Sequence, residues 1–301
     1  MSAEECLEVK AVLRIREQQV QNSLVMREAE NAMKVCPHCD STHIAKDGSK
    51  DGRQRFRCKA CCKTFNALTG TPMARLRKAE KHIENGHCMV EGLSIRKTAR
   101  LLGVSVPTAF LWRHRFLQAQ RDVQPQQLSG VVEVDETYFL ESFKGQRQGI
   151  PRPSKTRGTP AKKAGLSFEQ IPVLVARDRS STATLTAVLP SRKAKDIGAR
   201  LLPVLSTDSL LCSDGASAYR IIAKTKGIKV KSTPAKKAAG IYHINNVNSY
   251  DSRLKGWMFR FQGVATKYLP NYLGWHRMLD KTGANPTGLF MVSTSIAARK
   301  V

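Results

Sequence analysis

The chain has 301 residues, enough for about two domains, and its 50 lysines and arginines against 24 aspartates and glutamates give a formal net charge of +26 at pH 7. An excess of positive charge this large predicts a polyanionic partner, with nucleic acid ahead of an anionic membrane surface. We expect neither a membrane-spanning nor a secreted protein but a cytoplasmic one, because the sequence lacks an apolar run of about 18 residues and a signal-peptide start.

Residues 1–34 contain no glycine or proline and are rich in Glu, Arg, Gln, Val and Leu. This composition predicts an N-terminal helical segment, formed by one amphipathic helix or two. We expect the segment to pack against its neighbour in the chain or against a second subunit.

Residues 35–70 contain two Cys-x-x-Cys pairs with eighteen residues between them. In a reducing compartment such pairs are more often metal ligands than disulfides. Each pair places two thiolates on one turn, and two such turns close a tetrahedral Zn²⁺ site that can hold a segment too small to fold by its own core. We therefore predict a zinc ribbon with a structural zinc, in which Cys62 is the alternative to Cys61 as the last ligand. The four predicted zinc ligands are Cys36, Cys39, Cys58 and Cys61.

Residues 71–120 predict a helix-turn-helix that follows a first helical segment. Ser94 is a favourable N-cap for one helix, Gly103 lies in the turn, and the helix resumes near Pro107. The second helix would enter a major groove of DNA or contact its flanking phosphates, whereas the alternative is an ordinary helical hairpin. The candidate DNA contacts of the two modules are Arg53, Arg55 and Arg57 in the basic strand of the ribbon, and Thr108, Arg113 and His114 in the second helix.

Residues 121–129 predict a linker, and the strand that follows, Val131 to Leu140, carries acidic residues through an apolar run. Side chains alternate along a strand, so Glu133 and Asp135 share one face and Glu136 takes the other. A buried carboxylate is costly unless it is paired or bound to a metal. The strand is therefore either part of a metal site or an edge strand with a solvated face.

Residues 144–163 hold seven basic residues and no acidic one, among glycines, prolines and serines. This composition predicts a flexible basic loop. A basic loop beside an acidic strand could hold a phosphodiester near the carboxylates. The alternative is that the loop is a solvated surface insertion. Lys155 and Arg157 are its candidate DNA contacts.

Residues 130–280 predict a domain with the element order strand, strand, strand, helix, strand, helix, strand, helix, which is the order of a ribonuclease-H-like domain of the α/β class. Asp135 lies on the first strand and Asp214 ends the fourth, so neighbouring strands can bring both to one edge of the sheet. Paired carboxylates are natural ligands of Mg²⁺. Two such ions about 4 Å apart would activate a nucleophile and stabilise the leaving oxygen of a phosphoryl displacement.

A third motif lies in residues 242–256, which read Tyr-His-Ile-Asn-Asn-Val-Asn-Ser-Tyr-Asp-Ser-Arg-Leu-Lys-Gly. With the first strand and the segment around Asp214, it makes the chain resemble the DDE-type transposases of prokaryotic insertion sequences, in the group with an N-terminal zinc ribbon and helix-turn-helix. That group has the pattern His-x-Asn-x-x-Glu with a lysine seven residues on. Here Asn248 stands where the glutamate would fall, Lys255 matches the lysine, and Asp251 could supply the missing charge.

The resemblance implies a reaction, namely hydrolysis at the transposon ends and then attack of the freed 3′-hydroxyl on target DNA. Asp135, Asp214 and Asn248 would be catalytic residues that hold Mg²⁺ or Mn²⁺. Lys255 would contact the substrate phosphate, with His243 as a further candidate. The ribbon and the helix-turn-helix would bind the terminal inverted repeats, and a homodimer or larger assembly on double-stranded DNA, associated with the nucleoid of a prokaryotic cell, would hold two ends together.

Two other functions stay open. A DNA-binding regulator or a decayed transposase would need only the ribbon and the helix-turn-helix, and a structure-selective nuclease such as a Holliday-junction resolvase can share the catalytic fold. Residues 281–301 lie outside the resemblance, and we expect them to form a C-terminal tail.

Overall fold

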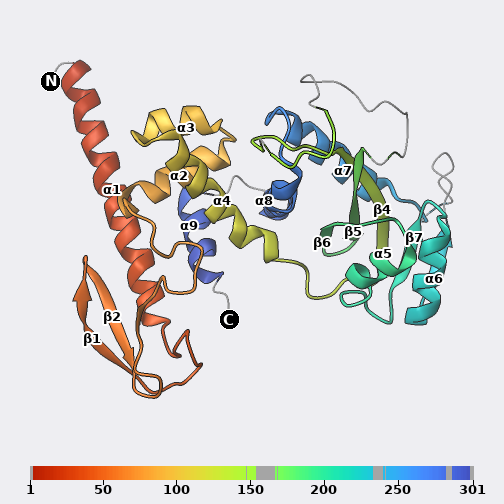
Figure 1. The fold of residues 1–301 in the computed structure, drawn as a ribbon, viewed down its shortest axis with the longest axis horizontal. Coiled ribbons are helices and arrows are strands. Elements are labelled where there is room, and N and C mark those ends of the chain that lie inside the picture. The colour runs from red at the N-terminus through yellow and green to blue at the C-terminus, as the bar shows by residue number, and fades with distance from the viewer. Residues whose placement is uncertain are drawn as a thin grey trace. The chain divides into compact units, whose positions relative to one another are not determined.

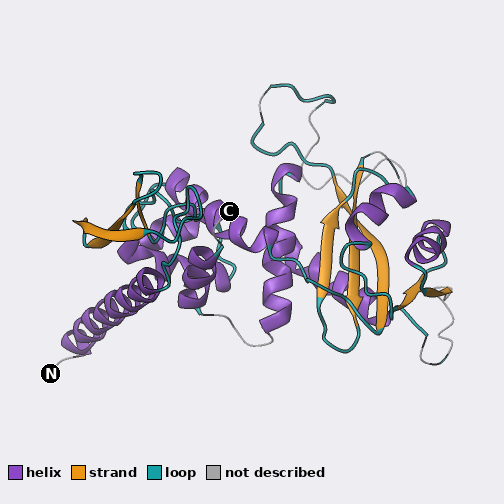
Figure 2. Cartoon of the chain, turned by 90° about the horizontal axis from the view of Figure 1, so that it is seen from below, coloured by secondary structure: helices purple, strands orange, loops and turns teal. Residues whose placement is uncertain are grey.

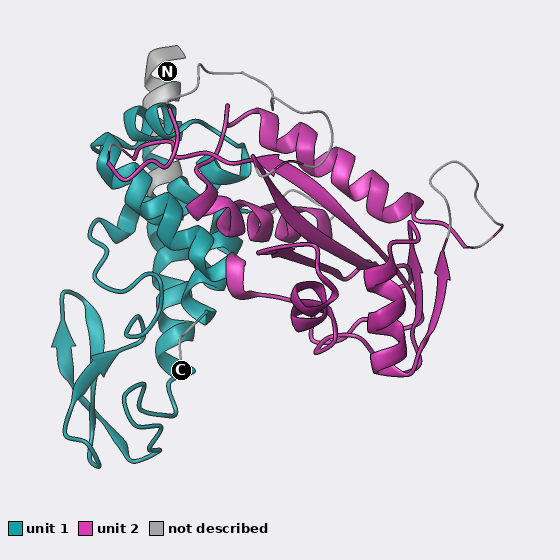
Figure 3. Cartoon of the chain, turned by 45° about the vertical axis from the view of Figure 1, so that its right-hand side comes forward, with its two compact units in different colours: residues 1–120, 284–301 teal, residues 121–283 magenta. Residues whose placement is uncertain are grey.

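The computed structural model describes residues 3–146, 148–153, 167, 169–232, 240, 242–282 and 287–298 (Figure 1). Figure 2 shows how helices, strands and loops alternate along this part of the chain. The chain divides into two compact units, unit 1 with residues 1–120 and 284–301 and unit 2 with residues 121–283 (Figure 3). None of the described helices is long and apolar enough to cross a membrane.

Unit 1 begins with a single helix, α1 (Ala3–Asn31), where the sequence left one helix or two open. A three-stranded antiparallel sheet follows, formed by β1 (Ile44–Lys50), β2 (Arg53–Cys58) and β3 (Thr64–Asn66) in that order. Phe56 and Phe65 are paired across β2 and β3, and their rings stack with centroids 5.7 Å apart. Together with the buried Cys36 and Cys58 they make a core of only a few side chains. A core this small is typical of a segment that a metal helps to fold.

The helix-turn-helix consists of α3 (Ile95–Leu102) and α4 (Val106–Asp122), preceded by η1 (Ala79–Lys81) and α2 (His82–Val90). As predicted, Ser94 caps α3, since its Oγ accepts the backbone N–H of Lys97 at 3.3 Å. Gly103 ends that helix at φ 57°, a left-handed conformation that glycine adopts without a Cβ clash. The turn of the motif therefore lies at the glycine expected from the sequence.

The C-terminal helix α9 (Gly288–Ala297) packs on α2 within unit 1. Its first residue, Gly288, lies so close to α2 that a Cβ there would stand 2.2 Å from the carbonyl oxygen of Ile83. Gly86 of α2 makes the reciprocal contact, because its Cβ would stand 2.5 Å from the Gly288 oxygen. Residues 281–301 were expected to be a tail, but the described part of this segment contains a helix of unit 1.

Unit 2 is built on a five-stranded sheet of order β6-β5-β4-β7-β8. The pairs β4–β5 and β5–β6 are antiparallel, and the pairs β4–β7 and β7–β8 are parallel, so β5 runs against the others. This order and these directions are those of a ribonuclease-H-like sheet, which confirms the predicted α/β class. The strands are β4 (Val131–Leu140), β5 (Gln170–Asp178), β6 (Thr184–Val188), β7 (Leu210–Ser213) and β8 (Lys229–Ser232).

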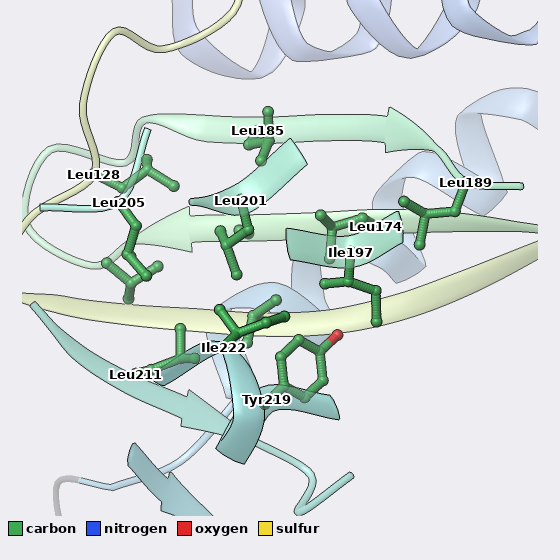
Figure 4. Close-up of a cluster of buried hydrophobic side chains, with 13 residues drawn as sticks. Leu128, Leu174, Leu185, Leu189, Ile197, Leu201, Leu205, Leu211, Tyr219 and Ile222 are labelled. Carbon is green, nitrogen blue, oxygen red and sulfur yellow. The ribbon is translucent and has the colours of Figure 1, made fainter. Parts of the chain in front are cut away.

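Helices cover both faces of the sheet in unit 2. On one face α5 (Ala194–Leu201) and α6 (Ser217–Lys226) pack on Val132 and Val134 in the buried hydrophobic cluster that Figure 4 shows. On the other face α7 (Asn245–Phe259) contacts β4 and β5, and α8 (Leu269–Thr282), which follows η2 (Thr266–Tyr268), contacts β6. Because side chains alternate along β4, Glu136 points toward α6 while Glu133 and Asp135 point toward α7.

Candidate functional site

Asp135 lies on β4, and Asp214 directly follows β7, the neighbouring parallel strand. The parallel pairing of β4 with β7 sets Glu133 opposite Cys212. Asp135 comes two residues after Glu133 in the chain, and Asp214 comes two residues after Cys212. Extending the register by those two residues places the aspartates side by side, at the point where β7 ends. The structure thus brings together two carboxylates that are far apart in the sequence.

Burial and neighbouring charge act together on Asp135. Its pKa is raised to about 6, with burial as the largest cause and the charges of Asp214 and Glu136 as further causes. The backbone N–H of Glu136 donates to Asp135 Oδ1 at 2.8 Å and acts against this rise. Asp214 is exposed, and its Oδ1 accepts the backbone N–H of Ala216 at 3.0 Å. A cation between the two carboxylates would favour their charged forms.

Helix α7 brings three candidate residues to the face of the sheet that carries Asp135. Asn248 and Lys255 are exposed, whereas Asp251 is only 8% exposed. The pKa of Asp251 is raised to about 7. Burial is the largest cause, the charge of Asp135 raises this pKa further, and the charge of Lys255 lowers it. Asp135 and Asp251 are therefore near enough for the charge on one to act on the other.

Glu133, on the same face of β4 as Asp135, anchors the start of α7. Its side chain is fully buried, and Oε2 accepts the backbone N–H groups of Asn246 and Val247 at 2.8 and 3.1 Å. Oε1 accepts hydrogen bonds from Asn246 Nδ2 at 2.7 Å and from Arg179 Nε at 2.9 Å. A carboxylate placed in this way satisfies free N–H groups of a helix N-terminus. Glu133 therefore fixes α7 on β4.

Two further polar residues near the acidic strand have partners inside unit 2. His243, a candidate for the substrate phosphate, has Nδ1 3.4 Å from Glu133 Oε1, and its backbone oxygen accepts Arg179 Nη2 at 3.2 Å. The ring of His243 thus lies within the Glu133 cluster. Glu136, on the opposite face, accepts a short hydrogen bond from the Tyr219 hydroxyl and has Oε2 3.5 Å from Arg192 Nε.

A cavity of about 850 Å³ opens beside Lys255, near the end of β4. The guanidinium of Arg152 lies over the Phe143 ring at 5.3 Å from its centroid. A lining that contains both basic and aromatic side chains suits phosphate pairing and base stacking. The basic and aromatic lining residues include Tyr138, Phe143, Lys144, Arg152, Lys255 and Phe259.

The four cysteines predicted as zinc ligands form a compact cluster in unit 1. All four Sγ atoms lie within 4.8 Å of one another, with Cys36 and Cys61 at 3.7 Å and Cys39 and Cys58 at 3.6 Å. A tetrahedral ion with Zn–S bonds of about 2.3 Å needs sulfur atoms about 3.8 Å apart, so the cluster fits zinc. Cys62 lies outside the cluster and is exposed.

Backbone amides of the two turns point at two of the four sulfur atoms. The N–H of Cys61 points at Cys58 Sγ, 3.5 Å away, and the N–H of His38 points at Cys36 Sγ, 3.4 Å away. The amide of Cys61 is the first of the contacts that lower the pKa of Cys58 to about 6. A thiolate available near neutral pH is the form that binds a metal.

The predicted DNA contacts of the second helix differ in the groups that they contact. Arg113 is buried, donates from Nη2 to the Leu93 carbonyl oxygen at 2.5 Å, and has Thr98 Oγ1 3.4 Å away. The prediction that Arg113 faces DNA is therefore wrong, because its guanidinium joins α4 to α3. Thr108 Oγ1 lies 2.8 Å from Ser105 Oγ, and the ring of His114 lies 4.4 Å from that of Phe110.

The other predicted DNA contacts lie on the ribbon and in the basic loop. Arg57 is exposed and Arg53 is half-buried, whereas Arg55 is paired with Asp47 at 3.0 Å. Lys155 and Arg157, the candidates in the basic loop, lie outside the residues that the structure describes.

Two family models and one relative match parts of the chain. Residues 127–275 match the ISXO2-like transposase domain, and residues 87–124 match a homeodomain-like domain. The chain is 28% identical over 267 residues to an uncharacterized protein in transposable element ISH50 of Halobacterium salinarum, covering 86% of this chain and 89% of that relative.

Solved structures similar to the chain include a transpososome and an intasome. A pre-cleavage Mos1 transpososome aligns at 11% identity over 73% of this chain and 79% of that chain, with a TM-score of 0.23. A simian T-cell lymphotropic virus intasome in complex with a PP2A regulatory subunit aligns at 11% identity over 59% of each chain, with a TM-score of 0.28.

Proposed function

Because the chain belongs to the insertion-sequence transposases that carry an ISXO2-like domain, we propose that it binds the terminal inverted repeats of an insertion sequence and catalyses metal-dependent DNA cleavage and strand transfer. The observation that best supports this proposal is the parallel register of β4 and β7, whose extension by two residues leads to Asp135 on one strand and to Asp214 after the other. A regulator that only binds DNA would need neither carboxylate. The net charge of +26 supplies affinity for the DNA backbone.

Asp135 and Asp214 would hold Mg²⁺ or Mn²⁺, because carboxylate oxygens are ligands that these ions prefer. The bound metal would supply Lewis-acid activation of the attacking oxygen and of the phosphate. Asn248, exposed on α7, would present a neutral amide oxygen at the rim of the site. Lys255, which lines the adjoining cavity, would pair with a phosphate of the DNA strand that enters there.

The proposed reaction has two displacements at phosphorus. In the first, a water molecule loses a proton as its oxygen bonds to the phosphorus at the transposon end, and the bond to the 3′-oxygen breaks as that oxygen takes up a proton. In the second, the freed 3′-hydroxyl loses its proton as its oxygen bonds to a phosphorus of target DNA, and the target's own 3′-oxygen leaves and is protonated. The second step exchanges one phosphodiester for another, so it needs no added energy source. Glu133 contributes by holding α7 in place against the strand of Asp135.

Unit 1 would recognise the transposon ends. The cysteine cluster would hold a structural Zn²⁺, and Arg53 and Arg57 of the ribbon would contact phosphates. Thr108 and His114 would contribute from the second helix of the helix-turn-helix. Strand transfer requires two ends, so we propose a homodimer or larger assembly on DNA, associated with the nucleoid of a prokaryotic cell.

A strand-transfer assay on a labelled terminal repeat, with Mg²⁺ or Mn²⁺ and a supercoiled target, tests this function. Wild type should release a 3′-hydroxyl end and join it to the target, whereas Asp135→Ala and Asp214→Ala should bind the repeat equally well and give no product. Equal product from wild type and Asp135→Ala would overturn the catalytic assignment. Repeat-specific binding without any product would favour a regulator, and cleavage of branched DNA without need for the repeat would favour a structure-selective nuclease.

A further inference from the structure

Helix α4, the second helix of the helix-turn-helix, exposes apolar side chains near its start. The buried side of the helix is marked by Trp112 and Phe116. Phe110 and Leu111, which lie in the first two turns and point away from that side, are 37% and 49% exposed, and Val106 at the first position is 45% exposed. Large apolar groups that are exposed close together mark an interaction site. We call Val106, Phe110 and Leu111 the apolar surface of α4.

The polar side chains on this stretch of α4 are few. Arg113 is buried and donates to the Leu93 carbonyl oxygen, so its guanidinium faces inward. Thr108 Oγ1 lies 2.8 Å from Ser105 Oγ, and His114 is half-buried. The side chains that read bases through paired hydrogen bonds are Arg, Lys, Asn and Gln, and residues 106–114 contain none of them apart from the buried arginine. Apolar contact is therefore the main means by which this stretch can distinguish bases.

Positive charge beside the apolar surface favours DNA over a protein as its partner. Helix α3, which the structure describes throughout, carries three exposed cations, Arg96, Lys97 and Arg100, and no acidic residue. In a helix-turn-helix the first helix crosses the DNA backbone, while the N-terminal residues of the second helix contact base edges in the major groove. The cations of α3 are thus on the helix that meets phosphates, and the apolar surface is on the part that meets bases.

The contacts within the motif hold the apolar surface in a fixed position. Arg113 Nη2 of α4 donates to the Leu93 carbonyl oxygen, just before α3, at 2.5 Å. Lys81 Nζ donates to the Leu102 carbonyl oxygen at the end of α3, at 2.6 Å. A surface held in this way can select a partner by shape, because it does not have to be ordered on binding.

One base carries an apolar group in the major groove, namely thymine with its C5 methyl. Adenine, guanine and cytosine offer hydrogen-bond donors and acceptors there, and these would remain unpaired against Phe110 or Leu111. Aromatic and other apolar side chains make favourable contacts with the thymine methyl. The chemistry of the apolar surface therefore matches thymine.

We propose that the apolar surface of α4 reads thymine methyl groups in the major groove of the transposon ends, with Phe110 and Leu111 as residues that determine specificity. This inference rests on the proposed function and deepens it, because it names the chemical feature by which unit 1 recognises the ends. The cations of α3 supply affinity through phosphates and do not distinguish one sequence from another.

Replacing thymine by uracil in a bound duplex removes the C5 methyl and keeps the base pair, so it tests this proposal directly. The full-length, zinc-loaded protein first selects duplexes from a random pool, and the selected sequence should contain thymine. Each contacted methyl that is lost should weaken wild-type binding by about fourfold, as for other buried groups of this size. Fluorescence anisotropy gives the ratio of the dissociation constants for the uracil and thymine duplexes, which does not depend on the folded fraction of a variant.

Variants of α4 show whether the apolar surface is the part that senses the methyl group. Phe110→Ala and Leu111→Ala should each lower the uracil-to-thymine ratio, and the double variant should bring it below about twofold. Arg100→Ala should weaken binding to both duplexes equally and keep the wild-type ratio, because a phosphate contact does not sense the methyl. Leu24→Ala in α1 removes another exposed leucine, 52% exposed, and should leave both dissociation constants unchanged.

The outcomes separate this inference from the proposed function. If wild type selects no duplex, recognition of DNA ends fails and the inference fails with it. If wild type binds a selected duplex but does not distinguish thymine from uracil, the proposed function stands and the inference is overturned. A double variant that keeps the wild-type ratio would also overturn it, and altered sedimentation of that variant would then assign the apolar surface to contact with another protein chain.

Discussion

The cysteine cluster of unit 1 and the carboxylates of unit 2 are both candidate metal sites, but they are assembled in different ways. The four cysteines come from two turns of one short segment, and all their sulfur atoms lie within 4.8 Å. The two aspartates come from different strands of the sheet, since Asp135 lies on β4 and Asp214 directly follows β7. Local ligands can close around an ion that folds the segment, whereas ligands from separate strands need a fold that already exists. The first site is therefore suited to a structural metal, and the second depends on the fold of unit 2.

The largest effect should follow from removing one cysteine of the cluster. Cys58→Ser should lower the zinc content from about one ion per chain to near zero and unfold the ribbon, since binding free energies on the order of 10 kcal/mol are also folding free energy in such sites. Elemental analysis of the purified protein and limited proteolysis of the ribbon measure both effects.

Cys62→Ser is the matched control for this experiment. Cys62 is the exposed neighbour of Cys61 and lies outside the cluster, so its replacement should leave zinc content and proteolysis unchanged. Loss of zinc from Cys62→Ser, with retention in Cys58→Ser, would reverse the assignment of ligands.

The second largest effect should follow from replacing Glu133. Comparison with Asp135, on the same face of β4, distinguishes a residue that stabilises the fold from a residue proposed to bind metal. Glu133→Ala should lower the free energy of unfolding of unit 2 by about 3–5 kcal/mol, because it leaves Arg179 and the start of α7 without their buried partner. Asp135→Ala should cause no such loss, since the charged form of Asp135 is disfavoured by burial. Urea unfolding of the two variants measures the difference, and equal destabilisation by both would contradict the division of roles.

Gly288→Ala tests whether unit 1, too, depends on contacts between distant parts of the chain. The new Cβ would stand 2.2 Å from the Ile83 oxygen, which should cost about 3 kcal/mol or force α9 away from α2. Thermal unfolding and DNA affinity report the change. Gly256→Ala in α7 is the control, since its Cβ would meet nothing within 4 Å and alanine should stabilise the helix by up to about 1 kcal/mol.

The smallest effect concerns acid sensitivity that does not involve either metal site. The pKa of His82 in unit 1 is lowered to about 4, chiefly by burial, so the unfolded chain binds the proton more readily than the folded one. Stability is therefore present above pH 6.5 and is lost as the pH falls, by about 1 kcal/mol at pH 5.5. His82→Phe should flatten this part of the pH profile in urea unfolding, and an unchanged slope would contradict it.

The part of the protein that was predictable from sequence is the part fixed by local spacing and element order. The Cys-x-x-Cys spacing identified the cluster, and the order of strands and helices placed Asp135 near Asp214. Arg113 was assigned to DNA incorrectly, although its spacing from the apolar Ala109, Trp112 and Phe116 would have placed it on the buried side of the helix.

The remaining features depend on contacts that no local pattern contains. Glu133 could be recognised as facing the same side as Asp135, but its role required the position of α7 and of Arg179, which lies in a turn. The last helix had a usable signal in Thr287, whose Oγ1 accepts the N–H of Phe290 at 3.1 Å ahead of an apolar stretch. Its packing on α2 was not visible in the sequence, because the two helices are separated by the whole of unit 2.

The contact of α9 with α2 also determines the order in which the protein can mature. The segments that complete unit 1 are translated before and after unit 2, so a ribosome finishes unit 1 only after it has made unit 2. A chain that stops within unit 2 would lack the last helix, so α2 would be left without the packing of α9.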